Sequence, residues 1–345
     1  MNKLTKVGLS ALCGSLAAVS SANAGDLTVT GGVDMSWVAL DGGTSTTGNP
    51  IGMGSNLTFK GSGELDNGWT FDLTVAMLNS DAYSNTVVAI DMGGLGKLQI
   101  DQGDSGNGID AFDDKMPTAW EEPWGNALGT GVKLVSGSGP QSNLMYTTPT
   151  LAGTTLTFTM APDMGSGNVA DKSYSGKSTG ATGAGHDLTI NINPSLGTEI
   201  LSGLNLFVGA HQTENTEATV NNTYEGVGGL TFDIGPISLG YAKSGVSTGN
   251  EDKSEADWYK NSMYGVAFNI NDDLSVSYGY QESRQGFVNP EDYQSIDLDM
   301  ESWQIAYSIG GASIRYADSK VNNAAYQTTD AFDKGSQVIS VSLAF

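Results

Sequence analysis

The sequence has no long apolar run, little positive charge and a single cysteine. Beyond the N-terminal segment no apolar run reaches about 18 residues, so the sequence predicts no membrane-spanning helix. Its 15 lysines and arginines stand against 38 aspartates and glutamates, a formal net charge of −23. Phosphate contacts need lysine and arginine, so this balance argues against nucleic-acid binding. A surface of this sign attracts cations instead.

The single cysteine, Cys13, lies in a segment that we expect to be removed. Residues 1–24 combine a short basic start, an apolar stretch and the sequence Ala22-Asn23-Ala24, which together are typical of a secretory signal peptide. Cleavage after Ala24 would remove two lysines and leave one domain, residues 25–345, with a net charge of −25. That domain has no cysteine, so it does not depend on disulfides.

Apolar residues alternate with small or polar ones through most of the remaining chain. At the C-terminus Ile339, Val341, Leu343 and Phe345 share one face of such a run. A period of two residues indicates a β-strand, and this one carries no lysine or proline from Gln337 onward to protect an exposed edge. We interpret it as the closing strand of a membrane barrel. Alternating faces also explain why the mean hydropathy is only −0.18.

Runs of this kind recur about sixteen times, beginning with Leu27–Ala39. We expect their connections to alternate between short turns, such as Asp66-Asn67-Gly68, and longer polar loops, such as residues 244–258 and 282–298. Outer-membrane barrels have short turns on the periplasmic side, long loops outside and an even number of strands. The sequence therefore predicts an all-β fold, a transmembrane antiparallel β-barrel of about sixteen strands. Phe345 would lie at the periplasmic rim, where it would serve closure and assembly.

The chain resembles the Gram-negative general-diffusion porins along the whole of residues 25–345. The resemblance rests on the closing strand with Phe345, on Gly96–Gly103 before the longest loop, and on Asn143–Gly153 after it, with its Asn, Tyr-x-x-Pro and Gly. It implies a homotrimer of barrels surrounded by outer-membrane lipid, each barrel with its own pore. It also implies that the long third loop folds into the lumen, with its acidic residues opposite a basic cluster on the wall.

The third loop, residues 104–142, is the candidate functional segment. Loops of this length are either functional or disordered, and Phe112, Trp120 and Trp124 argue against disorder. Pro123-Trp124-Gly125 is the only trace of the family's Pro-Glu-Phe-Gly-Gly motif, so an outward-pointing solvated loop stays open as the alternative. The expected pore constriction consists of the loop carboxylates Asp110, Asp113, Asp114, Glu121 and Glu122.

Positive charge on the expected pore wall is scarce. Lys60 and Arg315 have lumen-facing parity, whereas Arg284 falls in an expected loop. The wall carboxylates include Asp34 and Asp72, and pairing of Arg315 with Asp34 is the structural alternative to a role in the pore. Negative charge in a narrow pore concentrates cations and repels anions. We therefore expect a cation-preferring pore.

The sequence predicts no cofactor and no catalytic residue. His186 and His211 lack the spacing of a zinc site, and no nucleophile constellation or phosphate loop is present. Calcium could bind at an acidic loop, although a solvated loop is favoured because no EF-hand pattern occurs. The two candidate groups are Asp297, Asp299 and Glu301, and Glu251, Asp252 and Glu255.

We expect passive diffusion of small hydrophilic solutes and cations across the outer membrane. A substrate-specific channel of the same architecture is the first alternative. A secreted acidic adhesin or surface-layer β-protein is the second, although the calcium-binding Gly-Gly-x-Gly-x-Asp repeat is missing. An enzymatic barrel is the third, and the missing nucleophile constellation disfavours it.

Overall fold

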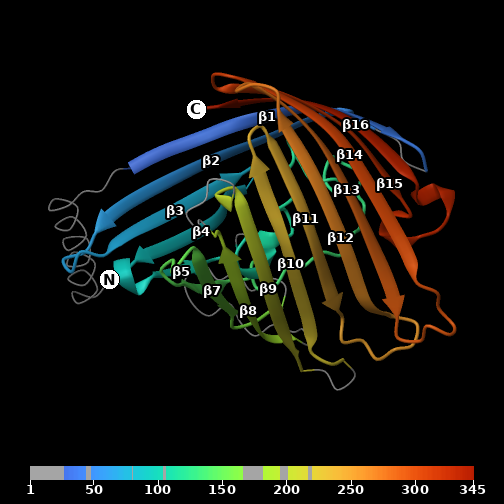
Figure 1. Ribbon diagram of the computed structural model, residues 1–345, viewed down its shortest axis with the longest axis horizontal. Helices are drawn as coiled ribbons and strands as arrows, with labels where there is room; N and C mark the ends of the chain where they lie inside the picture. The colour runs from blue at the N-terminus through green and yellow to red at the C-terminus, as the bar shows by residue number, and fades with distance from the viewer. Residues whose placement is uncertain are drawn as a thin grey trace, which may run out of the picture.

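The computed structural model describes residues 27–43, 48–79, 81–103, 106–165, 182–194, 201–216 and 220–345. The expected signal peptide, residues 1–24, lies outside these ranges. The described residues form one closed barrel of sixteen antiparallel strands, in which each strand pairs with its sequence neighbours and β16 pairs with β1 (Figure 1). The predicted fold class is confirmed.

The strands in chain order are β1 (Leu27–Asp41), β2 (Ile51–Glu64), β3 (Thr70–Leu78), β4 (Asp81–Asp91), β5 (Lys97–Asp101), β6 (Asn143–Thr147), β7 (Thr154–Ala161), β8 (Thr182–Ile192), β9 (Leu204–Asn215), β10 (Thr223–Ile234), β11 (Ile237–Ser247), β12 (Ala256–Asn269), β13 (Leu274–Phe287), β14 (Ile296–Ile309), β15 (Ala312–Asn322) and β16 (Lys334–Ala344). Short 3-10 turns are η1 (Gly93–Leu95), η2 (Gly108–Phe112), η4 (Ala324–Tyr326) and η5 (Asp330–Phe332). None of the described helices is long and apolar enough to cross a membrane.

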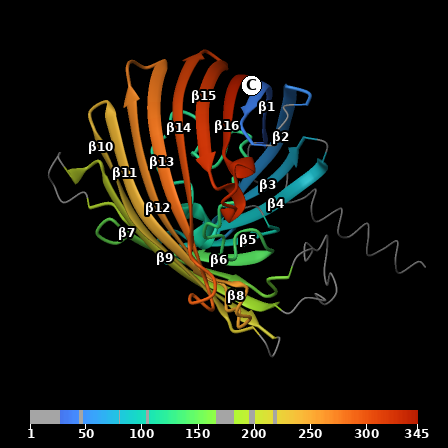
Figure 2. The same ribbon diagram turned by 90° about the vertical axis from the view of Figure 1, so that its right-hand side faces the viewer.

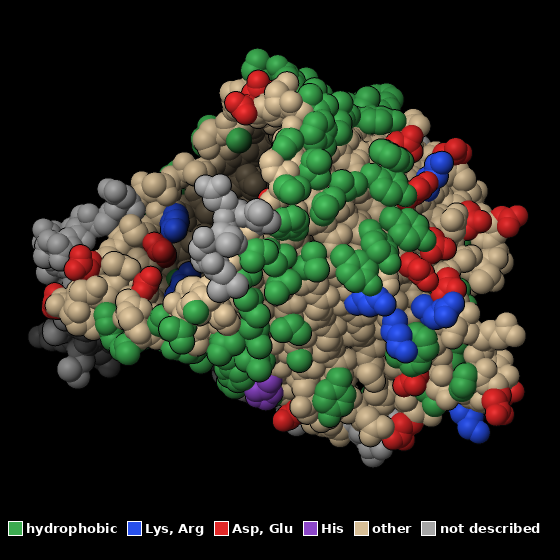
Figure 3. Space-filling model, in the orientation of Figure 1, with side chains coloured by type: hydrophobic (Ala, Val, Ile, Leu, Met, Phe, Trp, Pro, Cys, Tyr) green, Lys and Arg blue, Asp and Glu red, His purple; other side chains and the backbone are tan. Residues whose placement is uncertain are grey.

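The two faces of the strands differ as the alternation predicted. On β14, Trp303 points outward and is 62% exposed, whereas its neighbour Ser302 points inward and is fully buried. Figure 3 shows apolar side chains over much of the barrel wall, with most charged side chains gathered toward the right-hand side of that view. In a closed barrel the strands satisfy one another's backbone hydrogen bonds. An outer face without charged side chains can therefore contact hydrocarbon.

Several strands extend farther than the apolar alternation indicated. Residues 244–258 and 282–298 were expected to be loops, yet β11, β12, β13 and β14 reach well into both segments. Backbone pairing continues there through polar residues, because a strand beyond the hydrocarbon layer still needs its hydrogen bonds but no apolar face. Arg284 therefore lies on β13, and its expected position in a loop is wrong.

The expected alternation of short turns and long loops fails between β3 and β4. These strands are joined through residues 79–80 alone, at the end where the other connections are long. Asn79 adopts a positive φ of 54°, and its side-chain oxygen accepts the N–H of Ser55 on β2 at 3.1 Å. Asparagine tolerates this left-handed conformation better than most residues, which allows a tight connection without glycine.

An apolar core lies inside the barrel, where the third loop covers the wall. Figure 2 shows this loop, in green, within the ring of strands. The cluster joins loop residues Ile109, Phe112, Met116 and Val135 to wall residues Phe207, Val227, Ala242 and Met263 of β9 to β12. Each fully buried apolar side chain of this size contributes about 1.5–3 kcal/mol, so the loop is held by burial as well as by hydrogen bonds. The prediction that it folds into the lumen is confirmed.

The last long connection, residues 323–333, also turns inward. Tyr326 is buried in a second apolar cluster with Leu128 of the third loop and with Leu298 and Met300 of β14. Its hydroxyl lies 2.7 Å from Ser283 Oγ. Two connections that are distant in sequence therefore meet inside the barrel.

Candidate functional site

The third loop is hydrogen-bonded to the wall on its way across the lumen; the structure places its ends at residues 102 and 142, between β5 and β6. Trp120 and Glu121 donate their N–H groups to Gln304 Oε1 on β14, at 3.0 and 2.9 Å. Farther along, Ser336 Oγ on β16 donates to the carbonyl oxygen of Asn126 at 2.7 Å. Asn261 Nδ2 on β12 donates to the Lys133 carbonyl oxygen at 2.9 Å as the loop returns. These contacts fix a path that the sequence left open.

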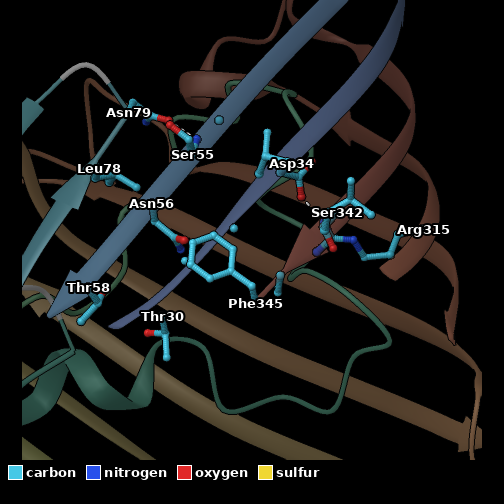
Figure 4. A pocket seen from close by; sticks show the side chains of 16 residues that line it. Thr30, Asp34, Ser55, Asn56, Thr58, Leu78, Asn79, Arg315, Ser342 and Phe345 are labelled. Carbon is cyan, nitrogen blue, oxygen red and sulfur yellow. Dashed lines mark hydrogen bonds and ion pairs between the residues drawn. The ribbon is translucent and has the colours of Figure 1, made fainter. Parts of the chain in front are cut away.

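A cavity remains beside the seam of the barrel. It measures about 490 Å³ and is lined mainly by β1, β2 and β16 together with Arg315 (Figure 4). Polar residues such as Thr30, Asn56 and Ser342 line much of it, as a solvated passage requires.

On the loop, Asp110 is buried and Asp113 is partly buried. Burial is the largest effect on both and raises the pKa of Asp110 to about 6 and that of Asp113 to about 7. The Gly106 N–H donates to Asp110 and opposes its shift, while repulsion from Asp114 reinforces both shifts. Asp110 and Asp113 therefore change charge near neutral pH.

Glu121 and Glu122 form a carboxyl pair farther along the loop. Burial raises the pKa of Glu122 far above its usual range, and a hydrogen bond and repulsion from Glu121 raise it further. The Glu122 N–H also donates to Glu121 Oε1 at 3.2 Å. Two carboxyl groups in such contact cannot both ionise easily, so the pair holds a proton at neutral pH.

Arg315 on β15 pairs with Asp34 on β1, which is the structural alternative weighed from the sequence. Ser340 Oγ joins the two, since it accepts from Arg315 at 2.9 Å and donates to Asp34 at 2.7 Å. The guanidinium carbon also lies 4.9 Å from the centre of the Trp120 ring. Arg315 thus links the seam of the barrel to the third loop through a cation–π contact.

Lys60 on β2 pairs with Asp72 on β3 at 3.6 Å, with side chains 52% and 44% exposed. The two cations expected on the wall are therefore paired with the two carboxylates expected there. Within the described residues no ion pair connects a loop carboxylate to the wall. The structure brings Arg315 to the loop, whereas the part that Lys60 and Asp72 play in the pore stays a prediction.

Phe345 extends the pairing at the seam. Its N–H donates to the Gly31 carbonyl oxygen at 3.0 Å, and the Gly31 N–H donates back to its oxygen at 3.2 Å. The residue is 80% exposed, and its ring lies against Gly31, where a Cβ atom would be 3.0 Å from Cζ. Phe345 lies at the end of the barrel with the short turns, since Ala344 bonds to Gly311 of the β14–β15 turn. Its role in assembly stays a prediction.

The acidic group expected at a loop near residue 297 lies instead on the outer face of β14. Asp297 pairs with Arg284, with the Arg284 Nε to Asp297 Oδ1 distance at 2.5 Å. Tyr280 donates to Asp299 at 3.1 Å, and Tyr278 donates to Glu301 at 3.0 Å. No metal-holding group of three or more His, Cys, Asp or Glu is found in the described ranges. Calcium binding at the Glu251–Glu255 loop stays a prediction.

Sequence reasoning gave no wall residue the role of holding the loop, although it placed Glu225 on the lumen face. The residues that hold the loop are Asp187 on β8, His211 on β9, Glu225 on β10 and Gln304 on β14. One signal was available: Phe207, Val227 and Met263 are apolar residues on faces expected to be polar. Apolar side chains that point into a barrel need a cover, and here the third loop supplies it.

Known proteins share this architecture. Salmonella typhi OmpF in complex with daunomycin has a TM-score of 0.69 at 13% identity, covering 93% of this chain and 98% of that one. The anion-selective porin from Comamonas acidovorans has a TM-score of 0.64 at 12% identity, covering 93% and 99%. OprB from Pseudomonas putida has a TM-score of 0.61 at 10% identity, covering 96% and 97%. At these identities the comparison shows the fold.

No curated protein sequence matches the chain significantly. The family model for Gram-negative porins, however, matches residues 8–311, which is most of the chain. Together with the closed barrel and the loop inside it, this match places the protein in the outer membrane as a channel. The chain belongs to the family of Gram-negative porins.

Proposed function

We propose that the protein is a cation-preferring, water-filled channel for passive diffusion of small hydrophilic solutes, without a cofactor or a chemical step. The observation that carries this proposal is the distribution of charge in the lumen. Residues 106–142, the part of the third loop described without a break, carry five carboxyl groups against two lysines, Lys115 and Lys133, while Lys60 and Arg315 on the wall are each paired with a wall carboxylate. The unbalanced charge near the loop is therefore negative, and it favours cations.

The fold by itself does not determine the sign of this preference. The Comamonas acidovorans porin is anion-selective and has the same fold. Selectivity in this chain must therefore come from its own charged residues, 38 acidic against 15 basic. Protonation of Glu122, and partial protonation of Asp110 and Asp113, reduces the loop charge at neutral pH without reversing it.

A homotrimer is part of the proposal. One structural neighbour is the trimer form of Vibrio cholerae OmpT, with a TM-score of 0.64 at 10% identity. Exposed apolar residues next to the seam, including Trp37, Ile51 and Met53, would suit contact with a second copy or with lipid. Closure of the channel in three equal steps would support the trimer.

The proposal is tested with the purified protein in a planar lipid bilayer. We expect discrete channels and a reversal potential in a potassium chloride gradient whose sign indicates preference for potassium. A preference for chloride would overturn the assigned selectivity, and absence of conductance would overturn the channel. Conductance that saturates, or that one solute blocks, would favour the substrate-specific alternative.

A further inference from the structure

A buried carboxylate on the wall holds both ends of the third loop. Asp187 of β8 accepts the Ile109 N–H at 3.0 Å, near the start of the loop. It also accepts the N–H and the hydroxyl of Ser138, near the end of the loop, at 3.2 and 2.7 Å. The Asp187 side chain is 0% exposed. One group thus binds two segments that lie about thirty residues apart, and at least three hydrogen bonds to a charged acceptor add up to a strong contact.

The loop is shaped to approach this carboxylate closely. Gly108 and Gly137 precede the two donor residues and have positive φ angles of 60° and 54°. A Cβ atom on Gly108 would lie 1.9 Å from Asp187 Oδ2, and one on Gly137 would lie 2.6 Å from it. Glycine is therefore needed at both positions, for conformation and for space. Backbone N–H groups that converge on an anion in this way form a nest.

His211 on the adjacent strand β9 orients the carboxylate from the wall side. Its Nδ1 lies 2.6 Å from Asp187 Oδ1, and its Nε2 lies 2.7 Å from Thr213 Oγ1. Both ring nitrogens are thus engaged, and the ring is 0% exposed. On the next strand, Glu225 Oε2 accepts the N–H groups of Ser136 and Gly137 at 2.7 and 3.0 Å. Here the wall supplies the acids and the loop supplies backbone donors.

We propose that Asp187, oriented by His211, is a positioning residue for the pore. It sets where the third loop lies in the lumen, and so it sets the size of the opening, although it is itself shielded from permeating ions. The strand pairing between β8 and β9 is made by the backbone and does not depend on this side chain. Loss of the Asp187 carboxyl group therefore releases the loop and leaves the barrel closed. The effect on conductance rests on the proposed channel function, whereas the release of the loop does not.

The test compares Asp187→Asn with a matched control, Asp233→Asn. Asp233 also faces the lumen, on β10, but its carboxylate accepts from Ser238 rather than from the third loop. Each substitution is combined with Val135→Cys, which places a thiol at a loop position that is 1% exposed and packed in the lumen core. The only natural cysteine, Cys13, is in the expected signal peptide, so the mature protein gives no background labelling.

We expect the thiol of Val135→Cys to react with a small maleimide roughly tenfold faster or more when Asp187 is replaced, as suits the loss of hydrogen bonds to a charged group. Single-channel conductance and open-channel noise should change in the same variant. The Asp233→Asn control should keep the labelling rate and the noise of the parent. Migration of unheated and heated samples on SDS gels confirms that each barrel is folded.

Unchanged labelling in Asp187→Asn overturns the inference, and so does an equal change in the control. Faster labelling with unchanged conductance also overturns it, because the released loop would then not set the pore. If Asp187→Asn does not fold, Ser138→Ala removes one loop donor and leaves the wall intact; its labelling must rise by a smaller factor for the inference to stand. If the parent protein itself fails to conduct, the proposed function is wrong, while the labelling still decides whether Asp187 holds the loop.

Discussion

The cation preference of the channel should increase as the pH rises from 5 to 8.5. Burial places the pKa of Asp110 at about 6 and that of Asp113 at about 7. Both carboxyl groups are therefore mainly protonated at pH 5 and mainly ionised at pH 8.5. Asp114 disfavours the ionisation of both groups, Glu225 and Asp187 disfavour that of Asp110, and Lys115 favours that of Asp113. The loop gains about two negative charges over this interval.

The size of the effect follows from elementary electrostatics. A charge at about 7 Å from a permeating ion contributes about 0.6 kcal/mol in water, and salt screening reduces this to about half. Two charges then change the energy of a cation by about 0.6 kcal/mol, or a factor of about three. An anion changes by the same factor in the opposite direction, so the ratio of cation to anion permeability should rise roughly five- to tenfold.

The assay is the reversal potential in a tenfold potassium chloride gradient at pH 5, 6, 7 and 8.5. The double substitution Asp110→Asn and Asp113→Asn should remove most of the pH dependence. Asp252→Asn, an exposed carboxylate in the β11–β12 loop, is the matched control and should keep it. A permeability ratio that is flat across this range, or a double variant that behaves like the parent, would refute the reasoning.

The raised pKa values of Asp110 and Asp113 also predict how the stability of the docked third loop changes with pH. An acid whose pKa is raised in the folded state binds its proton more tightly there than in the unfolded chain. The protonated acid contributes fully to the stability of the folded state below its ordinary pKa. That contribution is lost as the pH rises through the pKa of the folded state. For Asp110 and Asp113, release of the docked loop should therefore become easier from about pH 4 to pH 7. Labelling of Val135→Cys measures this once each rate is divided by that of a free thiol at the same pH, because the thiolate is the reacting form.

Three further predictions concern the seam and the wall. Phe345→Ser should lower the amount of assembled barrel in membranes, and so should Gly31→Val, which lies beneath the Phe345 ring. The channels that do insert should keep the parent conductance. Normal insertion would leave Phe345 with no role beyond that of an aromatic residue at the rim. Arg315→Ala leaves Asp34 unpaired, so it should raise cation preference. It should also lower the free energy of unfolding by about 1–3 kcal/mol, a range that already allows for the partial exposure of the pair. An unchanged denaturation midpoint would contradict this. Lys60→Gln removes an exposed pair, so thermal stability should change by less than about 0.5 kcal/mol while cation preference rises slightly; a large loss of stability would show that this pair is structural.

The sequence predicted the elements that repeat. Alternation such as that of Ile339, Val341 and Leu343 identified the strands, because one lipid-facing side chain in every two leaves a periodic signature. It was less accurate where strands continue beyond the hydrocarbon, since Arg284 and Asp297 lie on polar extensions with no such signature. The β3–β4 connection was expected as a short loop around Asp81, and it is tighter than that because Asn79 supplies the turn without the usual glycine.

The candidate site was predicted by residue type more than by geometry. Parity placed Arg315 and Asp34 on the lumen face, and the structure pairs them across the seam. The loop carboxylates were identified, but their differing burial was not, because burial depends on what covers each residue. Asp187 and His211 were not singled out as site residues, since nothing in the local sequence shows that a loop far away will bind there.

The sequence by itself determined the barrel and its closing strand, because strand periodicity and turn chemistry act over a few residues. Only the tertiary structure decided the course of the third loop and the state of its charges. Trp120 meets Gln304 across 184 positions of the chain, and Ile109 meets Asp187 across 78. Contacts of this kind depend on where the closed barrel places its walls, and the shifts in pKa of Asp110 and Asp113 follow from the burial that results.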